Sequence, residues 1–67
     1  MDVFVWRDDE KLMATRIDAA DAGTLPRQGE LVYLPERHET SRVLTVMWTM
    51  TPYPGVTRVD LYVGARR

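Results

Sequence analysis

The sequence contains no cysteine and only one histidine, His38. Without cysteine there is no disulfide and no thiolate metal site, and a single imidazole cannot form a histidine cluster. A chain of 67 residues has a small core, and small domains without disulfides or metals commonly gain stability by oligomerising. We therefore expect one small domain, residues 1–67, that relies on a well-packed sheet or on association with another chain.

Charge of one sign is not in excess either, because nine basic and ten acidic residues give a net charge of −1. Such a chain has no broad cationic field with which to hold nucleic acid or an anionic membrane. No apolar run approaches the length that crosses a bilayer. Met1 is followed directly by Asp2 rather than by the segments of a signal peptide. The expected compartment is the cytoplasm, with no membrane contact.

The charged residues and glycines form no pattern typical of an enzyme or a metal site. The four glycines are scattered, so no phosphate-binding loop is present. The acidic turn at residues 8–10 lacks the alternating spacing of a calcium-binding loop. His38 lies in a charged turn near Ser41, but neighbours on one turn rarely reach the geometry of a catalytic triad. We predict no enzymatic activity and no cofactor, and we expect His38 to be a solvated turn residue.

What the sequence does contain is a series of short segments rich in β-branched and aromatic residues, which are typical of strands. The predicted strands are residues 2–7, 11–17, 30–34, 41–50 and 56–63. Residues 18–28 fit either one helical turn capped by Asp18 or a plain surface loop, and we favour the loop. The pattern predicts an all-β fold, a five-stranded antiparallel small barrel or curled sheet.

The spacing of apolar residues in the fourth predicted strand indicates a bulge. Val43 and Val46 are three residues apart, whereas Val46 and Trp48 are two apart, so all three can face one core only if the strand is bulged between Val43 and Val46. With Trp48 at the centre of the core, we expect Trp48→Ala to cost about 3–5 kcal/mol. The predicted core consists of one face of the first strand together with Val32, Leu34, Val43, Val46, Trp48, Val59, Leu61 and Val63.

Three segments resemble a family of small, uncharacterised proteins of phage and bacterial genomes: 25–34 (LPRQGELVYL), 42–48 (RVLTVMW) and 59–63 (VDLYV). Those proteins read LPR-x-GE-x-V-x-L, then a V-x-x-V-x-W strand and a closing alternating strand. The resemblance implies an SH3-like small barrel and a phage-type accessory protein. It covers about two thirds of the chain, from Leu25 onward, and brings no functional residues with it.

Several predicted strands carry apolar residues on both faces, which a sheet with one face in water does not need. In the first strand, for example, valines at positions 3 and 5 alternate with aromatic residues at positions 4 and 6. One small interior cannot hold all of these side chains, so we predict an interface with a protein partner or in a homodimer. We expect the open edge of the sheet at the first or the last strand. The predicted contact residues are Leu31, Tyr33, Met47, Met50, Tyr53 and Tyr62.

The alternative prediction is a barrel that binds single-stranded nucleic acid through aromatic side chains and arginines. Arg16, Arg42 and Arg58 lie in or next to predicted strands, close in sequence to several of the six aromatic residues. We rank this function below protein binding because Glu30 and Asp60 lie among the same strands and the net charge is slightly negative.

Overall fold

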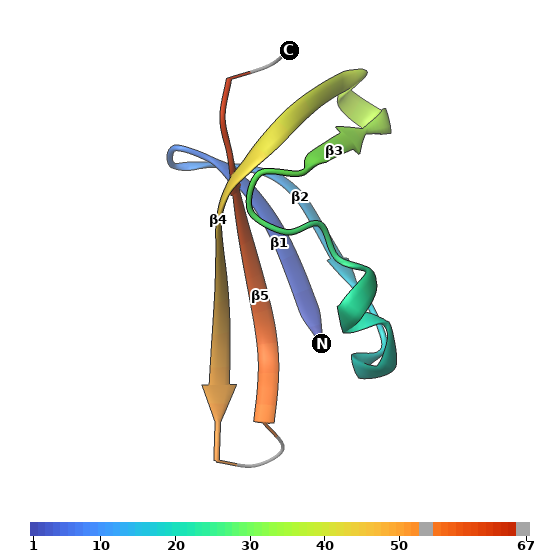
Figure 1. Cartoon of the computed structure of the whole chain (residues 1–67), viewed down its shortest axis with the longest axis vertical. Helices are drawn as coiled ribbons and strands as arrows, with labels where there is room; N and C mark the ends of the chain where they lie inside the picture. Colours follow the sequence, from blue (N-terminus) through green and yellow to red (C-terminus); the bar gives the residue numbers. More distant parts are fainter. Residues whose placement is uncertain (53–54, 66–67) are drawn as a thin grey trace.

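The computed structural model describes residues 1–52 and 55–65. Five strands form one sheet that curls into a half-barrel, and two short 3-10 helices lie in the connections (Figure 1). The all-β fold class predicted from the sequence is confirmed. The elements are β1 (Asp2–Arg7), β2 (Glu10–Arg16), η1 (Ala19–Thr24), β3 (Leu31–Leu34), η2 (Pro35–Arg37), β4 (Glu39–Thr51) and β5 (Gly55–Val63).

The sheet is mixed rather than antiparallel, because β1 and β5 pair in parallel while the other three ladders are antiparallel. The strand order is β2-β1-β5-β4-β3. The first and last strands are therefore central, and the prediction that one of them forms an open edge was wrong. The physical reason is that Val3 and Val5 of β1 pair in register with Val59 and Leu61 of β5, and burial of all four together places both strands in the middle of the core.

The bulge predicted in the fourth strand is confirmed. Val43 pairs with Val63 and Thr45 pairs with Tyr62, so Leu44 is the extra residue on β4. β4 bends at this point (Figure 1). As a result, its first part, Glu39 to Arg42, pairs with β3, and the part from Val43 onward pairs with β5.

The segment between β2 and β3 contains a helical turn rather than the plain loop that we favoured. The turn is the 3-10 helix η1, and Asp18 at its start makes no side-chain capping hydrogen bond. It is held instead by local backbone contacts: the Asp21 N–H donates to the Asp18 carbonyl at 2.9 Å, and the Thr24 hydroxyl donates to the Asp21 carbonyl at 2.6 Å. Short polar residues favour such local hydrogen bonds, which explains why the composition resembled that of a loop.

The core lies on the concave side of the half-barrel. Five of the core residues predicted outside the first strand are buried, while Val32 and Val46 are only partly buried against the core. The prediction for Trp48 was wrong, since this residue is 45% exposed. Trp48 lies on the part of β4 that extends beyond β3, where no described strand covers the concave side. The buried apolar residues are Val3, Val5, Leu12, Leu34, Val43, Val59, Leu61 and Val63.

One end of the half-barrel is closed by Arg7, the last residue of β1. Its Nη2 donates to Ser41 Oγ at 2.9 Å and lies 3.3 Å from Glu39 Oε1, and its Nε donates to the Gly64 carbonyl at 2.9 Å. Ser41 and Glu39 are both buried. A single guanidinium thus joins the end of β1 to the start of β4 and to the residue that follows β5.

We expect Leu61→Ala to lower the free energy of unfolding by about 2–5 kcal/mol, because Leu61 is 2% exposed in the middle of the core. Trp48→Ala should cost less, about 1–2 kcal/mol, since nearly half of this side chain already contacts water. Urea unfolding followed by circular dichroism measures both. An equal or larger loss for Trp48→Ala would show that the core extends along the end of β4.

His38 ends η2 in the left-handed conformation, with φ at +50°. Its side chain is exposed, as the sequence predicted. A Cβ is disfavoured in this conformation, whereas glycine adopts it without cost. His38→Gly should therefore raise the free energy of unfolding by about 0.5–1 kcal/mol, and His38→Ala, which keeps the Cβ, should not. Thermal unfolding of the two variants compares them directly, and an equal effect of both would contradict this account.

Candidate functional site

The predicted contact residues do not form one surface. Leu31 and Tyr33 are exposed on β3, at the far side of the bulge from Met47. Met47 and Tyr62 lie on the convex face of β4 and β5, whereas Met50, by strand alternation, lies on the concave side with Trp48. The sixth predicted residue, Tyr53, lies outside the described residues.

The convex face carries a row of side chains that runs across three strands. Phe4 of β1 pairs with Asp60 of β5, and Asp60 pairs with Met47 of β4. In the next row, Trp6 pairs with Tyr62. Met47 is 51% exposed, while the aromatic residues of both rows are half-buried. This face therefore presents a row of aromatic and thioether side chains.

An ion pair is set into this face. Arg58 Nε donates to Asp60 Oδ2 at 2.9 Å, Arg58 Nη2 donates to Oδ1 at 2.9 Å, and Trp6 Nε1 also donates to Oδ1 at 2.9 Å. The guanidinium carbon of Arg58 lies 4.3 Å from the centre of the Phe4 ring, a cation–π distance. Asp60 is buried by these neighbours. The charges of Arg58 and Asp60 therefore offset one another on the convex face.

Hydrogen bonds from Arg58 lower the pKa of Asp60; burial acts in the opposite direction, and the hydrogen bond from Trp6 lowers it further. Because the pKa is lower in the folded chain than in the unfolded one, Asp60 stabilises the fold fully above about pH 4. This contribution is lost as the pH falls through the lowered, folded-state pKa.

Asp60→Asn removes this carboxylate but keeps its shape. We expect the variant to be less stable than the original chain near neutral pH, and the difference to shrink as the pH is lowered below about 4. Urea unfolding at a series of pH values gives the difference directly. A difference that is the same at all pH values would mean that the charge of Asp60 does not contribute.

The arginines of the nucleic-acid alternative are all engaged by the chain itself. Arg58 is paired with Asp60, Arg16 donates from Nε to Asp2 Oδ1 at 3.0 Å, and the Arg42 guanidinium donates to the Gly29 carbonyl. The ion pairs of Arg58 and Arg16 offset positive charge that phosphate groups would otherwise meet, whereas Arg42, bonded to a neutral carbonyl, keeps its charge.

The charged turn places its polar residues apart from one another. Ser41 Oγ accepts a hydrogen bond from Arg7 in the buried end of the half-barrel, whereas His38 is exposed at the end of η2. In residues 1–52 and 55–65, no group of three or more histidine, aspartate or glutamate side chains is placed to hold a metal ion.

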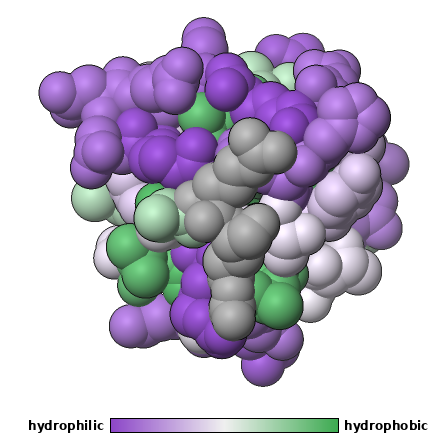
Figure 2. All heavy atoms as spheres, turned by 90° about the horizontal axis from the view of Figure 1, so that it is seen from above, coloured by the Kyte–Doolittle hydropathy of each residue, from purple (hydrophilic) through white to green (hydrophobic). Residues whose placement is uncertain are grey.

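Viewed along the long axis from the end that carries η2, most of the visible surface is hydrophilic (Figure 2).

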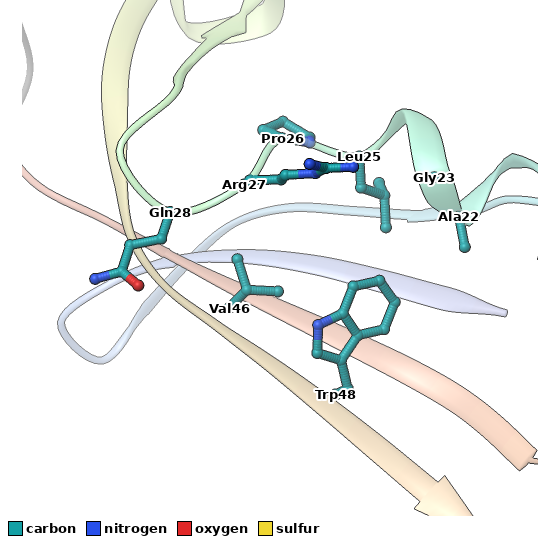
Figure 3. A pocket seen from close by; sticks show the side chains of 8 residues that line it. All are labelled: Ala22, Gly23, Leu25, Pro26, Arg27, Gln28, Val46 and Trp48. Carbon is teal, nitrogen blue, oxygen red and sulfur yellow. The ribbon is translucent and has the colours of Figure 1, made fainter.

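The concave side contains a groove that the sequence did not predict. The groove has a volume of about 380 Å³ and lies between the end of β4 and the segment that joins η1 to β3. Val46 and Trp48 point from β4 toward Leu25 and Pro26 of that segment, and Arg27 lies beside them (Figure 3). The walls that the described residues form are therefore mostly apolar, and Arg27 is the one charged side chain among them.

The groove opens along an unpaired edge of β4. β3 pairs with β4 only from Glu39 to Arg42, and the Gly29 and Glu30 backbones add hydrogen bonds to Val43. Beyond that point, no strand among the described residues pairs with this edge of β4 over residues 44–50. Two signals in the sequence pointed to this edge: the third predicted strand is much shorter than the fourth, and residues 43–51 carry no charge.

The comparisons with known proteins found no matching family model, no matching curated protein and no matching solved structure. No helix in the described part of the chain has the length and apolar character needed to cross a membrane.

Proposed function

We propose that this chain is a non-enzymatic protein-binding module, which acts by docking on a protein partner or by forming a homodimer. The observation that carries the proposal is the exposure of large apolar side chains on β4. Among residues 1–52 and 55–65, four of the six exposed large hydrophobic side chains belong to this one strand: Leu44, Met47, Trp48 and Met50. Met47 lies on the convex face and Trp48 and Met50 on the concave side, so this strand exposes apolar groups on both faces. Exposed apolar groups of this kind mark surfaces that other molecules cover.

The composition of these residues also supports a protein partner. Methionine adapts its shape to irregular surfaces, and tryptophan and tyrosine contribute much of the binding energy of protein interfaces. Leu31 and Tyr33 on β3 are two further exposed apolar side chains, on the other side of the bulge. The buried, charged end of the half-barrel at Arg7 offers no comparable contact area.

Nucleic-acid binding is the second candidate, and the convex face favours it. Phe4, Trp6 and Tyr62 present aromatic rings there, and Lys11 lies 5.7 Å from the centre of the Phe4 ring. Binding to single strands through such a face falls steeply with salt concentration, whereas binding through an apolar protein interface does not. Affinity measured at several salt concentrations therefore separates the two functions.

We also propose a fold type, a location and a role for the chain. We propose that the half-barrel is of the SH3-like type, supported by the bulged β4 shared between β3 and β5, although the parallel β1–β5 ladder departs from the antiparallel barrel that we expected. We also propose a cytoplasmic location and a phage-type accessory role, both of which rest on the sequence.

A glutamate at Met47, Tyr33 or Tyr62 puts a charge on the proposed contact surfaces, which disfavours their burial against a partner. If the chain forms a homodimer, light scattering at micromolar concentration should give twice the 7.8 kDa mass, and these variants should shift it toward the monomer. If the partner is foreign, the variants should weaken its binding while the circular dichroism spectrum stays unchanged.

Ala20→Glu is the matched control, since it adds the same charge to an exposed residue of η1. It should change neither the mass nor the binding. A chain that is monomeric at all concentrations and is cross-linked to no protein in its host cells would contradict the proposed function.

A further inference from the structure

The unpaired edge of β4 and the groove beside it form one continuous recess. Val46 and Trp48 project from this strand into the groove, and the backbone of residues 44–50 runs along the open side (Figure 3). An extended peptide laid along such an edge makes main-chain hydrogen bonds, and every second side chain points to one side. On β4 the side chains on one side, Val46 and Trp48, point into the groove, so alternate side chains of the bound peptide would point into it as well.

This edge lacks the features that normally prevent strands from pairing with other chains. Natural edges are kept short, charged or interrupted by proline. The two outer edges of the sheet follow this rule, since β2 carries Glu10, Lys11 and Arg16 and β3 has only four residues. Residues 44–50 of β4 carry no charge, no proline and no glycine, and the side chains there are β-branched or large and apolar. Among the strand edges of the described chain, this one alone is both long and unprotected.

The charge of the groove indicates what kind of segment fits it. Among the described residues that line the groove, Arg27 alone is charged, and it is exposed. Within residues 1–52 and 55–65 its guanidinium has no hydrogen bond or ion pair, while its backbone N–H donates to Glu30 Oε1 at 2.6 Å. A carboxylate is the group that an arginine at the edge of an apolar recess attracts most strongly.

We propose that the recess binds an extended segment of another protein, which adds to β4 as a strand, places apolar side chains against Trp48 and directs an acidic side chain to Arg27. This inference rests on the proposed protein-binding function and adds the site and the chemistry of the partner. A second copy of this chain fits less well, because the unpaired part of its own β4 contains no acidic residue to meet Arg27.

The test uses the full chain and a displayed library of random peptides about ten residues long, the length of a long strand. We expect the selected peptides to alternate apolar residues and to contain aspartate or glutamate at one position. Trp48→Ala and Arg27→Glu should each weaken binding of a synthesised, selected peptide by about ten-fold or more. Replacing the acidic residue of the peptide with lysine should restore binding to Arg27→Glu.

Two control variants match these changes. Thr49→Ala alters the exposed residue next to Trp48, on the opposite face of β4, and Arg16→Glu makes the same charge change on β2, at the far side of the sheet. Both should bind the selected peptide as the original chain does. Circular dichroism and urea unfolding show whether each variant is folded, so that a loss of binding is not mistaken for a loss of structure.

Hydrogen exchange followed by NMR tests the strand addition itself. In the free chain the amides of residues 44–50 that face the open edge should exchange fast, and in the complex every second amide of this segment should become protected. Selected peptides without an acidic residue, or binding without this protection, would overturn the inference. So would a free chain in which light scattering gives a dimer and these amides are already protected, since a second copy would then occupy the edge. In that last case the proposed function stands, whereas a monomer that binds neither peptide nor protein contradicts both.

Discussion

The parallel ladder between β1 and β5 is the contact on which the rest of the sheet depends. It is the only ladder in the described chain that joins the β1–β2 hairpin to the β3–β4–β5 meander. Its register places Val3 beside Val59 and Val5 beside Leu61, and all four are buried. The most deeply buried apolar side chains therefore lie at this junction. Without the other half, the β1–β2 hairpin or the β3–β4–β5 meander would expose its inner apolar side chains to water.

Polar groups lock the same junction at two points. On the convex face, Trp6 of β1 donates to Asp60 of β5, and at the closed end Arg7 of β1 donates to the Gly64 carbonyl just after β5. Buried charges are tolerated only when they are paired and hydrogen-bonded, and these partners come from strands that meet only in the folded sheet. Such contacts fix the register of the ladder as well as its position.

Local alternation was enough to predict the five strands and the bulge between Val43 and Val46, because both follow from which neighbouring residues share a face. The parallel pairing was not predictable in this way, since no local pattern names the partner of β1. The burial of Trp48 was predicted wrongly for a related reason. Alternation gave the correct face of β4 for this residue, but its burial depends on how far β3 extends along β4. The exposure of Leu31, Tyr33 and Met47 followed from the excess of two-sided strands. The groove at Arg27, in contrast, depends on the segment before Gly29, which reaches β4 only at Gly29.

The central position of β5 has a consequence for folding during synthesis. The ribosome makes β1 and β2 first, and their hairpin emerges with Val3 and Val5 uncovered. These valines gain their neighbours Val59 and Leu61 only after nearly all of the chain described here has been made. Pairings between residues so distant in sequence form slowly, and unpaired apolar strands are prone to aggregate while they wait. The nascent chain thus has no complete core for most of its synthesis. During this period the exposed valines of the hairpin are available to a chaperone or to another protein that binds early.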